Sequence, residues 1–175
     1  MSQYPVITAG KVSVADLQAM IDDYVIKASA TTRTSTTTVS DDPELVTPTL
    51  VANGIYLVEF VIRMAGLAAA GFKTQWSVPS GASGNKDCMG PGSANATEAN
   101  GNTTELRWAV HGFTTAVAYT DPRNSASLQV PVIERSIVTL GGTAGTITLQ
   151  WAQNSSNATG TVVAAGSYVR TRRIG

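Results

Sequence analysis

The stretch VPVIERSIVTLGGTAGTITLQWAQNSSNATGTVVAAGSYVRTRRIG (Val130–Gly175) decides the fold class. Runs of Val, Ile, Thr, Tyr and Trp alternate in it with Gly, Asn and Ser, which is typical of consecutive β-strands joined by turns. Gly141–Gly145 separates the first two predicted strands, and Asn154–Gly160 separates the second from the third. Because the third run closes the sequence, we expect a terminal strand that lies inside a sheet.

Ile55–Gly66 (IYLVEFVIRMAG) carries the clearest strand pattern upstream of this stretch. Its side chains alternate with a period of two, so Tyr56, Val58, Phe60 and Ile62 share one face of the predicted strand. The intervening residues share the other face. This segment is therefore expected to be a long strand with one face on the core.

Shorter runs of β-branched and aromatic residues predict the remaining strands. Asp41–Glu44 contains a proline and is predicted to be a turn, and Asn53-Gly54 is a strong signal for a hairpin. About eight strands result, which predicts an all-β, jelly-roll-like antiparallel β-sandwich. The further strands are expected at Ser29–Ser40, Leu45–Val51, Gly71–Pro79 and Glu105–Thr120.

Two segments lie outside this pattern. Met1–Lys11 is expected to be an extended arm, because Pro5 and Gly10 interrupt it. Val14–Val25 has apolar residues at helical spacing, which predicts a helix of about three turns. We therefore divide the chain into an N-terminal arm and helix (residues 1–28) and a β-sandwich (residues 29–175).

So short a helix is marginal alone and must pack on something. It could cover the end of its own β-domain, or it could bundle with the same helix of other subunits. In the second case the arm and the helix supply the docking or trimer contacts. The side chains expected to make them are Tyr4, Val6, Ile7, Leu17, Met20, Ile21 and Tyr24.

Two predicted strands share a Gln-Trp ending, which is explained either by two similar halves of the fold or, as we favour, by chance similarity of two strands. Phe72–Trp76 and Ile147–Trp151 both end in Gln-Trp after an apolar residue four positions earlier. Trp76 and Trp151 are expected to anchor the core. Between the predicted strands, Ser80–Thr104 is rich in Gly, Ser and Asn, and a loop of this length is usually functional, mobile or an interface.

Composition excludes several classes of protein. Of 175 residues, 43% are hydrophobic and only 14% are charged, and the formal net charge is zero. Charge-driven disorder needs the opposite balance, and nothing global points to nucleic acid or to an anionic membrane. The sequence shows neither a run of eighteen apolar residues nor a secretory signal. Because Cys88 is the single cysteine and no intrachain disulfide is possible, synthesis in a reducing cytoplasm is expected.

Reactive chemistry is sparse. His111 is the single histidine and Cys88 the single cysteine, so a Ser-His-Asp or Cys-His device has one imidazole available and zinc ligands are too few. We predict no catalytic residue, no cofactor and no metal. A glycan hydrolase with paired carboxylates is left open as the alternative from another class. For Arg170, Arg172 and Arg173, ion pairs with a partner subunit or a solvated edge are favoured over nucleic acid.

Four stretches of this sequence are similar to motifs that occur in the same order in a known protein family. They are ITAGKVSVADLQAM (7–20), TTRTSTTTVSDDPEL (31–45), ANGIYLVEFVIRMAG…FKTQWSVPSGA (52–82) and AGTITLQWAQNSSNATGTVVAAGSYVRTRRI (144–174). In this combination the chain resembles small virion structural proteins of tailed phages that infect actinobacteria. The resemblance covers most of the chain except Asp87–Asn102.

The resemblance implies a non-enzymatic, trimeric, jelly-roll-like protein displayed on a virion. Members of the family are capsid decoration, head-fibre or minor tail proteins, and no catalytic residues are carried over from it. We expect a trimeric capsid decoration or head-fibre protein that docks on the major capsid protein or another virion protein. The alternative is a minor tail or fibre protein that binds host-surface glycan.

Overall fold

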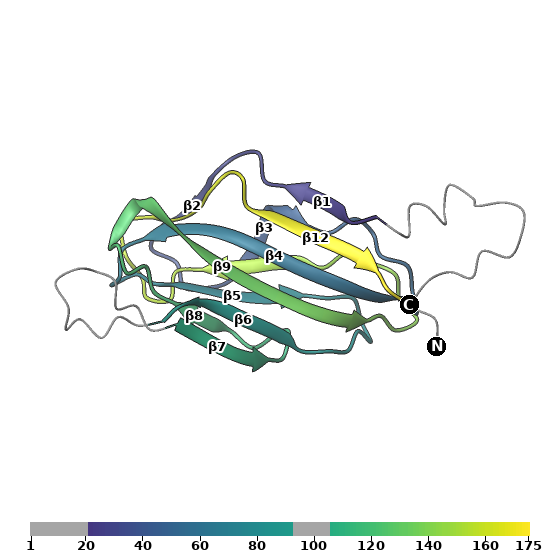
Figure 1. The fold of residues 1–175 in the computed structure, drawn as a ribbon. Coiled ribbons are helices and arrows are strands. Elements are labelled where there is room, and N and C mark those ends of the chain that lie inside the picture. Colours follow the sequence, from purple (N-terminus) through teal and green to yellow (C-terminus); the bar gives the residue numbers. More distant parts are fainter. Residues whose placement is uncertain (1–20, 93–105) are drawn as a thin grey trace, which may run out of the picture.

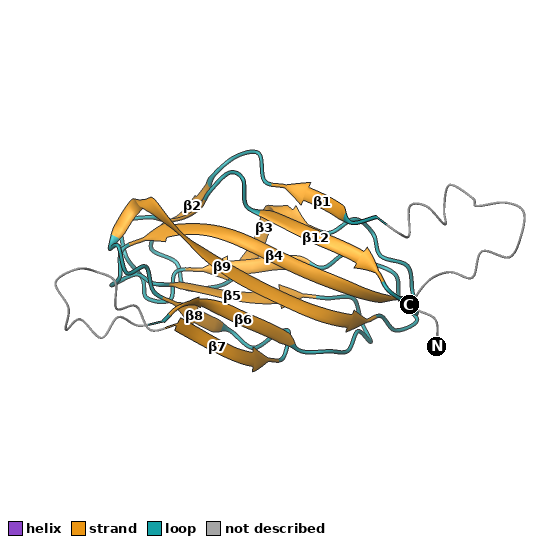
Figure 2. Cartoon of the chain, in the orientation of Figure 1, coloured by secondary structure: helices purple, strands orange, loops and turns teal. Residues whose placement is uncertain are grey.

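Twelve strands and no helix make up residues 21–92 and 106–175, which are the parts of the chain that the computed structural model describes. The strands form two antiparallel sheets packed face to face (Figures 1 and 2). A two-sheet β-sandwich is therefore confirmed, and the jelly-roll subtype stays a prediction. In these residues no helix exists that could span a membrane.

The larger sheet contains eight strands. Six of them follow the order β1-β12-β4-β9-β6-β7, while β11 pairs with β4 and β2 pairs with β11. Their bounds are β1 (Asp23–Ile26), β2 (Thr31–Arg33), β4 (Ile55–Gly66), β6 (Lys86–Pro91), β7 (Leu106–His111), β9 (Ser125–Thr139), β11 (Thr161–Val163) and β12 (Tyr168–Arg173).

The smaller sheet lies behind the larger one in the view of Figure 1 and has the order β3-β10-β5-β8. Its bounds are β3 (Ser40–Val46), β5 (Phe72–Ser77), β8 (Val117–Tyr119) and β10 (Thr148–Ala152).

The long strands β4 and β9 form the centre of the larger sheet. They pair from Ile55 opposite Thr139 to Met64 opposite Val130. The alternation seen in the sequence of β4 has the predicted effect, since Val58, Phe60 and Ile62 are fully buried. Strand β12 lies between β1 and β4, so the expected terminal strand inside a sheet is confirmed.

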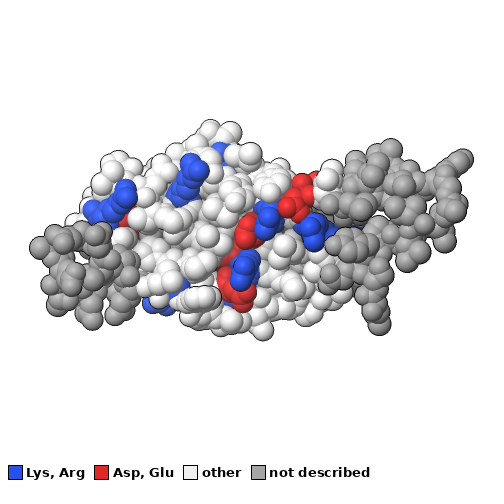
Figure 3. Space-filling model, viewed as in Figure 1, with Lys and Arg blue, Asp and Glu red and all other residues white. Residues whose placement is uncertain are grey.

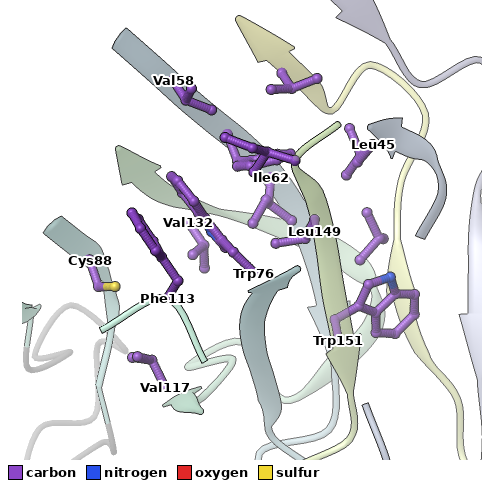
Figure 4. Close-up of a cluster of buried hydrophobic side chains, with 14 of the residues drawn as sticks. Leu45, Val58, Ile62, Trp76, Cys88, Phe113, Val117, Val132, Leu149 and Trp151 are labelled. Atoms are coloured by element: carbon purple, nitrogen blue, oxygen red, sulfur yellow. The ribbon is translucent and has the colours of Figure 1, made fainter. Parts of the chain in front are cut away.

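The core lies between the two sheets and combines aliphatic side chains with several packed aromatic rings (Figure 4). Trp76 packs edge-on against Phe60 at 4.9 Å between ring centroids and stacks on Phe113 at 5.7 Å. Trp151 contacts Phe72 at 5.6 Å. Both tryptophans are fully buried.

The two Gln-Trp segments lie on neighbouring strands. Strands β5 and β10 pair antiparallel with Gln75 opposite Gln150, and the Gln75 amide donates a 2.7 Å hydrogen bond to the Gln150 side-chain oxygen. Because the strands run in opposite directions, Trp76 and Trp151 lie on either side of this pair. The similarity in sequence thus corresponds to a local two-fold arrangement at the centre of the smaller sheet.

Two predictions about the elements are wrong. The described residues contain twelve strands rather than about eight, because short strands such as β1, β2 and β11 have too few residues to show a period. The helix predicted over Val14–Val25 ends in a strand instead, since β1 (Asp23–Ile26) pairs with β12. Pairing along the edge of β12 outweighs the helical spacing there. Residues 14–20 lie outside the described part.

The turn predictions also need correction. Asp41–Glu44 is part of strand β3 and not a turn, and Pro43 is tolerated there because β3 is an edge strand. Asn53 has a positive φ of 59°, a conformation that asparagine tolerates in turns, but it does not close a hairpin. Strand β3 belongs to the smaller sheet and β4 to the larger, so this turn carries the chain from one sheet to the other.

The predicted loop Ser80–Thr104 contains strand β6. The last predicted strand is split into β11 and β12 at a turn in which Gly166 has a φ of +80°, a conformation that suits glycine. Glu105–Thr120 gives the two short strands β7 and β8, which was one of the two predicted outcomes.

Truncating either buried tryptophan should destabilise the fold. We expect Trp76→Ala and Trp151→Ala each to lower the free energy of unfolding by about 3–5 kcal/mol, because a large aromatic leaves a cavity. Chemical denaturation measures this. Val51→Ala is the control, because Val51 is 57% exposed, and it should change stability by less than about 0.5 kcal/mol. Parental stability of both tryptophan variants would contradict the described core.

Candidate functional site

A buried carboxylate, Glu134, is the centre of the first polar cluster. It faces the core from β9 and is fully buried. The Trp76 indole N–H donates to it at 2.6 Å and the Tyr119 hydroxyl at 2.8 Å. The Lys86 ammonium, also fully buried, lies 3.2 Å from the carboxylate, and the Thr74 hydroxyl donates to it as well. Every contact is internal to the core.

This cluster combines side chains that serve as acids, bases and nucleophiles elsewhere. Burial, and secondarily the charge of Glu134, raises the pKa of the Cys88 thiol to about 12. The same two causes raise the pKa of Tyr119. Both groups therefore stay protonated. A buried ion pair whose donors and acceptors are all engaged holds structure together, and breaking it is costly.

A second cluster, around Asp42, has the same design. The buried Asp42 carboxylate lies 2.9 Å from the Lys27 ammonium and accepts the Trp151 indole N–H at 2.9 Å. The backbone N–H groups of Glu44 and Leu45 each donate to it at 3.0 Å. Burial works to raise the pKa of Asp42, but the hydrogen bonds from Lys27, these amides and Trp151 outweigh it, and the pKa is lowered.

Each Gln-Trp segment therefore supplies an indole to a buried carboxylate that also holds a lysine. The sequence predicted the tryptophans as core residues but not their partners. Glu134 lies 58 residues from Trp76, and Asp42 lies 109 residues from Trp151. No local spacing could have linked them.

The outward face of the larger sheet carries the surface features of interest, and Figure 3 views this face. We call the first of them the charged row. It crosses four neighbouring strands at one level, with Arg170 on β12, Glu59 on β4, Arg135 on β9 and Asp87 on β6. Arg170 lies 3.2 Å from Glu59, and Arg135 lies 3.5 Å from Asp87. Positive and negative charges alternate along it (Figure 3).

Two residues further along each strand, and hence on the same face, lies an apolar row. The pairing register places its members directly opposite one another across six strands. Its two ends are the most exposed, since Trp108 is 73% and Ile26 is 63% exposed. In order from β1 to β7 the row contains Ile26, Tyr168, Val61, Ile133, Met89 and Trp108.

The ends of the charged row are apolar as well. Tyr24 lies opposite Arg170 on β1, and Val110 lies opposite Asp87 on β7; both are exposed. The Tyr24 ring also contacts that of Tyr168 at 5.8 Å. Together, the charged row, the apolar row, Tyr24 and Val110 define what we call the outer face.

The predicted docking residues fall partly on this face. Tyr4, Val6, Ile7, Leu17 and Met20 lie outside the described residues. Ile21 is exposed beside an open pocket that Leu50, Tyr56 and Arg173 also line. Tyr24 is exposed on the outer face, on a strand rather than a helix.

The other singled-out residues are placed as follows. His111 ends β7 and is half-buried, and Cys88 is buried in the core. Arg170 pairs with Asp22 at 3.4 Å as well as with Glu59. Within residues 21–92 and 106–175 no three metal-ligating side chains gather. The open pocket beside β1 contains one carboxylate, that of Asp23.

No protein-family model matches the chain, and no curated protein matches its sequence. Among solved structures, the chain is similar to the tripod (BppUct-A-L) from the baseplate of bacteriophage Tuc2009. The TM-score is 0.35 and the sequence identity 9%, over 99% of this chain and 75% of that chain.

The Asp42 cluster predicts how stability depends on pH. The folded-state pKa of Asp42 is depressed below the unfolded value of about 3.9. Its contribution is therefore fully present above about pH 4 and is lost as pH falls through the folded-state pKa. Asp42→Asn should cost about 3–5 kcal/mol at pH 7, because Lys27 loses its buried partner. The difference from the parent should shrink toward pH 2.5 in urea titrations, and a constant difference would contradict this account.

The Cys88 thiol should be unreactive in the folded protein. Its raised pKa leaves about one thiolate in ten thousand at pH 8, and the sulfur is buried. We expect a disulfide reagent to label the native protein only as fast as it unfolds, and to label one thiol at once in urea. Cys88→Ser, which should show no labelling in urea, is the control. Rapid stoichiometric labelling without denaturant would show that the core around Cys88 is open.

Proposed function

We propose that the chain is a non-enzymatic structural protein of a phage virion. The observation that carries this proposal is that the charged residues fall into two sets, one buried in the core and one on the surface. The charged side chains of the Glu134 and Asp42 clusters are buried and stabilise the core. Those of the charged row lie across the broad outward face of the larger sheet. Such a face suits contact with another macromolecule. The motif combination that resembles phage virion proteins points the same way.

In its finer form the proposal is a trimeric capsid decoration or head-fibre protein. Such a protein must stay soluble alone and then dock on a repeated surface. A surface of few charges with balanced signs suits both requirements, because it neither repels a protein lattice nor attracts nucleic acid. The arm Met1–Lys11 is proposed as the docking element, with the major capsid protein or another virion protein as partner.

The virion location can be tested directly. Purified particles from an infected culture should contain this chain at a fixed ratio to the major capsid protein, measured by quantitative mass spectrometry. Imaging of particles that carry a tag on the C-terminal Gly175 should show density on the head lattice. Density on the tail would overturn the decoration proposal but keep the virion one. Absence of the chain from purified particles would overturn both.

Deleting Met1–Lys11 tests the docking element. The β-domain should remain folded, because the described sandwich begins at β1 (Asp23–Ile26). Particles that lack the protein should take up the full-length chain but not the truncated one, since several arms on one oligomer bind with avidity. Circular dichroism of the truncated form is the control for folding. Full occupancy by the truncated form would place docking on the β-domain.

A minor tail or fibre protein that binds host-surface glycan is the second candidate. The observation that favours it is Trp108, whose side chain is 73% exposed on β7, because exposed aromatic rings are common anchors of recognition surfaces. In this case Trp108→Ala should abolish binding of the pure protein to host cell-wall polysaccharide. Under the decoration proposal the pure protein shows no such binding.

A glycan-degrading hydrolase is the rival from another class. It requires two carboxyl groups facing one groove at about 5–10 Å. Glu134 and Asp42 are instead buried beside lysines. The hydrolase proposal predicts release of reducing sugars from host polysaccharide, which a standard assay detects. Release that is lost in a carboxylate variant would overturn the non-enzymatic proposal.

A further inference from the structure

The two halves of the outer face are complementary in charge. A line between β4 and β9 divides it into a first half (β1, β12, β4) and a second half (β9, β6, β7). Next to this line, Glu59 on the first half corresponds to Arg135 on the second. One strand further out, Arg170 corresponds to Asp87. At each position, equally far from the line, the two halves carry opposite charges.

We propose that copies of this chain associate through this face, around an axis that runs parallel to β4 and β9. A rotation about such an axis keeps the level of each residue along its strand. It brings the first half of one copy against the second half of the next. Glu59 of one copy then faces Arg135 of the next, and Arg170 faces Asp87. Every contact in the charged row joins opposite charges.

The apolar row obeys the same rule. It lies at one level along the strands, so it meets the apolar row of the next copy. Val61 then faces Ile133, Tyr168 faces Met89, and Ile26 faces Trp108. The two most exposed apolar side chains of the row, Trp108 and Ile26, cover each other in this arrangement. A half-exposed apolar row beside paired charges is the composition of an interface core with polar surroundings.

A second copy fits this face better than a different partner does. The charged row contains two arginines and two acidic residues, so it offers no net charge to an anionic or a cationic surface. Its order is what makes it complementary to itself. The two rows themselves cover on the order of 400 Å², taking six strands about 4.8 Å apart and four residues of about 3.3 Å along each. The whole outward face of these six strands covers on the order of 800 Å². This is about the area that each partner contributes to a standard interface.

This inference deepens the proposed self-association of the chain and rests on that part of the proposed function. A two-fold axis brings all of these pairs into contact, because the two faces then lie flat against each other. Around a three-fold axis the faces meet at an angle, so outer pairs such as Ile26 and Trp108 would meet before the central ones. What it adds is the surface and the pairing of residues. Virion location is a separate question that the particle analysis above answers independently. The chain could be absent from virions and still associate through this face, or be present in virions as a monomer.

Exchanging charges within one half tests the pairing. Asp87→Arg/Arg135→Asp reverses the second half and keeps an opposite-charge pair between β6 and β9 within the chain. Glu59→Arg/Arg170→Glu does the same for the first half. Either double variant places like charges at every contact of the row, which should weaken self-association at least about 100-fold. Sedimentation of the pure full-length chain at micromolar concentration should show an oligomer for the parent and monomers for both variants.

Combining all four substitutions restores opposite charges at each contact, so the fourfold variant should associate like the parent. An equimolar mixture of the two double variants reports the symmetry. A two-fold pair of one variant with the other has only opposite charges in contact, and the mixture should associate. A three-fold ring of two kinds of subunit always contains one pair of the same kind, and the mixture should stay dissociated while the fourfold variant recovers.

Trp108→Asp provides a second route that does not alter the charged row. Because the side chain is exposed on an edge strand, the variant should fold but dissociate. Val51→Asp is the matched control, since Val51 is similarly exposed but does not belong to the outer face; it should leave association unchanged. Thermal melts confirm folding of each variant.

A monomeric parent at all concentrations would overturn the inference. So would oligomers of parental strength in both double variants, or in Trp108→Asp. Failure of the fourfold variant to associate, while it melts like the parent, would show that the charges act without the proposed pairing. If association is instead lost only when residues 1–20 are deleted, the N-terminal segment and not the outer face joins the copies.

Discussion

The carboxylate of Glu134 is the point on which the arrangement of the two sheets depends. It projects from the centre of the larger sheet and accepts hydrogen bonds from Trp76 on β5 and Tyr119 on β8, which belong to the smaller sheet. Lys86 on β6 completes the cluster. A buried carboxylate without these partners would cost several kcal/mol, so four strands must reach their places together. Apolar contacts alone would allow one sheet to shift relative to the other. A buried charge that needs specific hydrogen-bond donors from the other sheet does not allow this.

This internal constraint also determines what the outer face presents. Side chains alternate along a strand, so holding Glu134 inward places Ile133 and Arg135 outward on β9. A slip of one residue would bury Arg135 and expose Glu134, and it would break every bond of the cluster. The levels of the charged row and the apolar row across β4, β9 and β6 are therefore fixed from inside the core. The same strand register thus determines both the buried network and the composition of the outer face.

The sequence was informative where a pattern is local and uninformative where pairing decides. The long alternation of Ile55–Gly66 predicted β4 and its buried face, because twelve residues show a period clearly. Lys86–Pro91 contains Gly and Pro, and it became a strand only through pairing with β7 and β9. Asp23–Ile26 continued a helical spacing, yet the edge of β12 made it a strand. The outer face could not be predicted, since its rows join residues from six strands whose register no local motif encodes.

The low charge content of the chain has a physical consequence for such a face. Only 14% of the residues are charged, and the charges beside the charged row include Asp22 and Arg172, which pair with each other and, through Asp22, with Arg170. The order of charges in the row therefore influences how another surface can approach. Balanced charges in water contribute little net affinity but penalise every wrong alignment. Exposed aromatic and aliphatic side chains such as Trp108 and Ile26 supply affinity without selecting an alignment. The apolar row therefore contributes affinity, and the charged row specifies which strand of the next copy lies opposite.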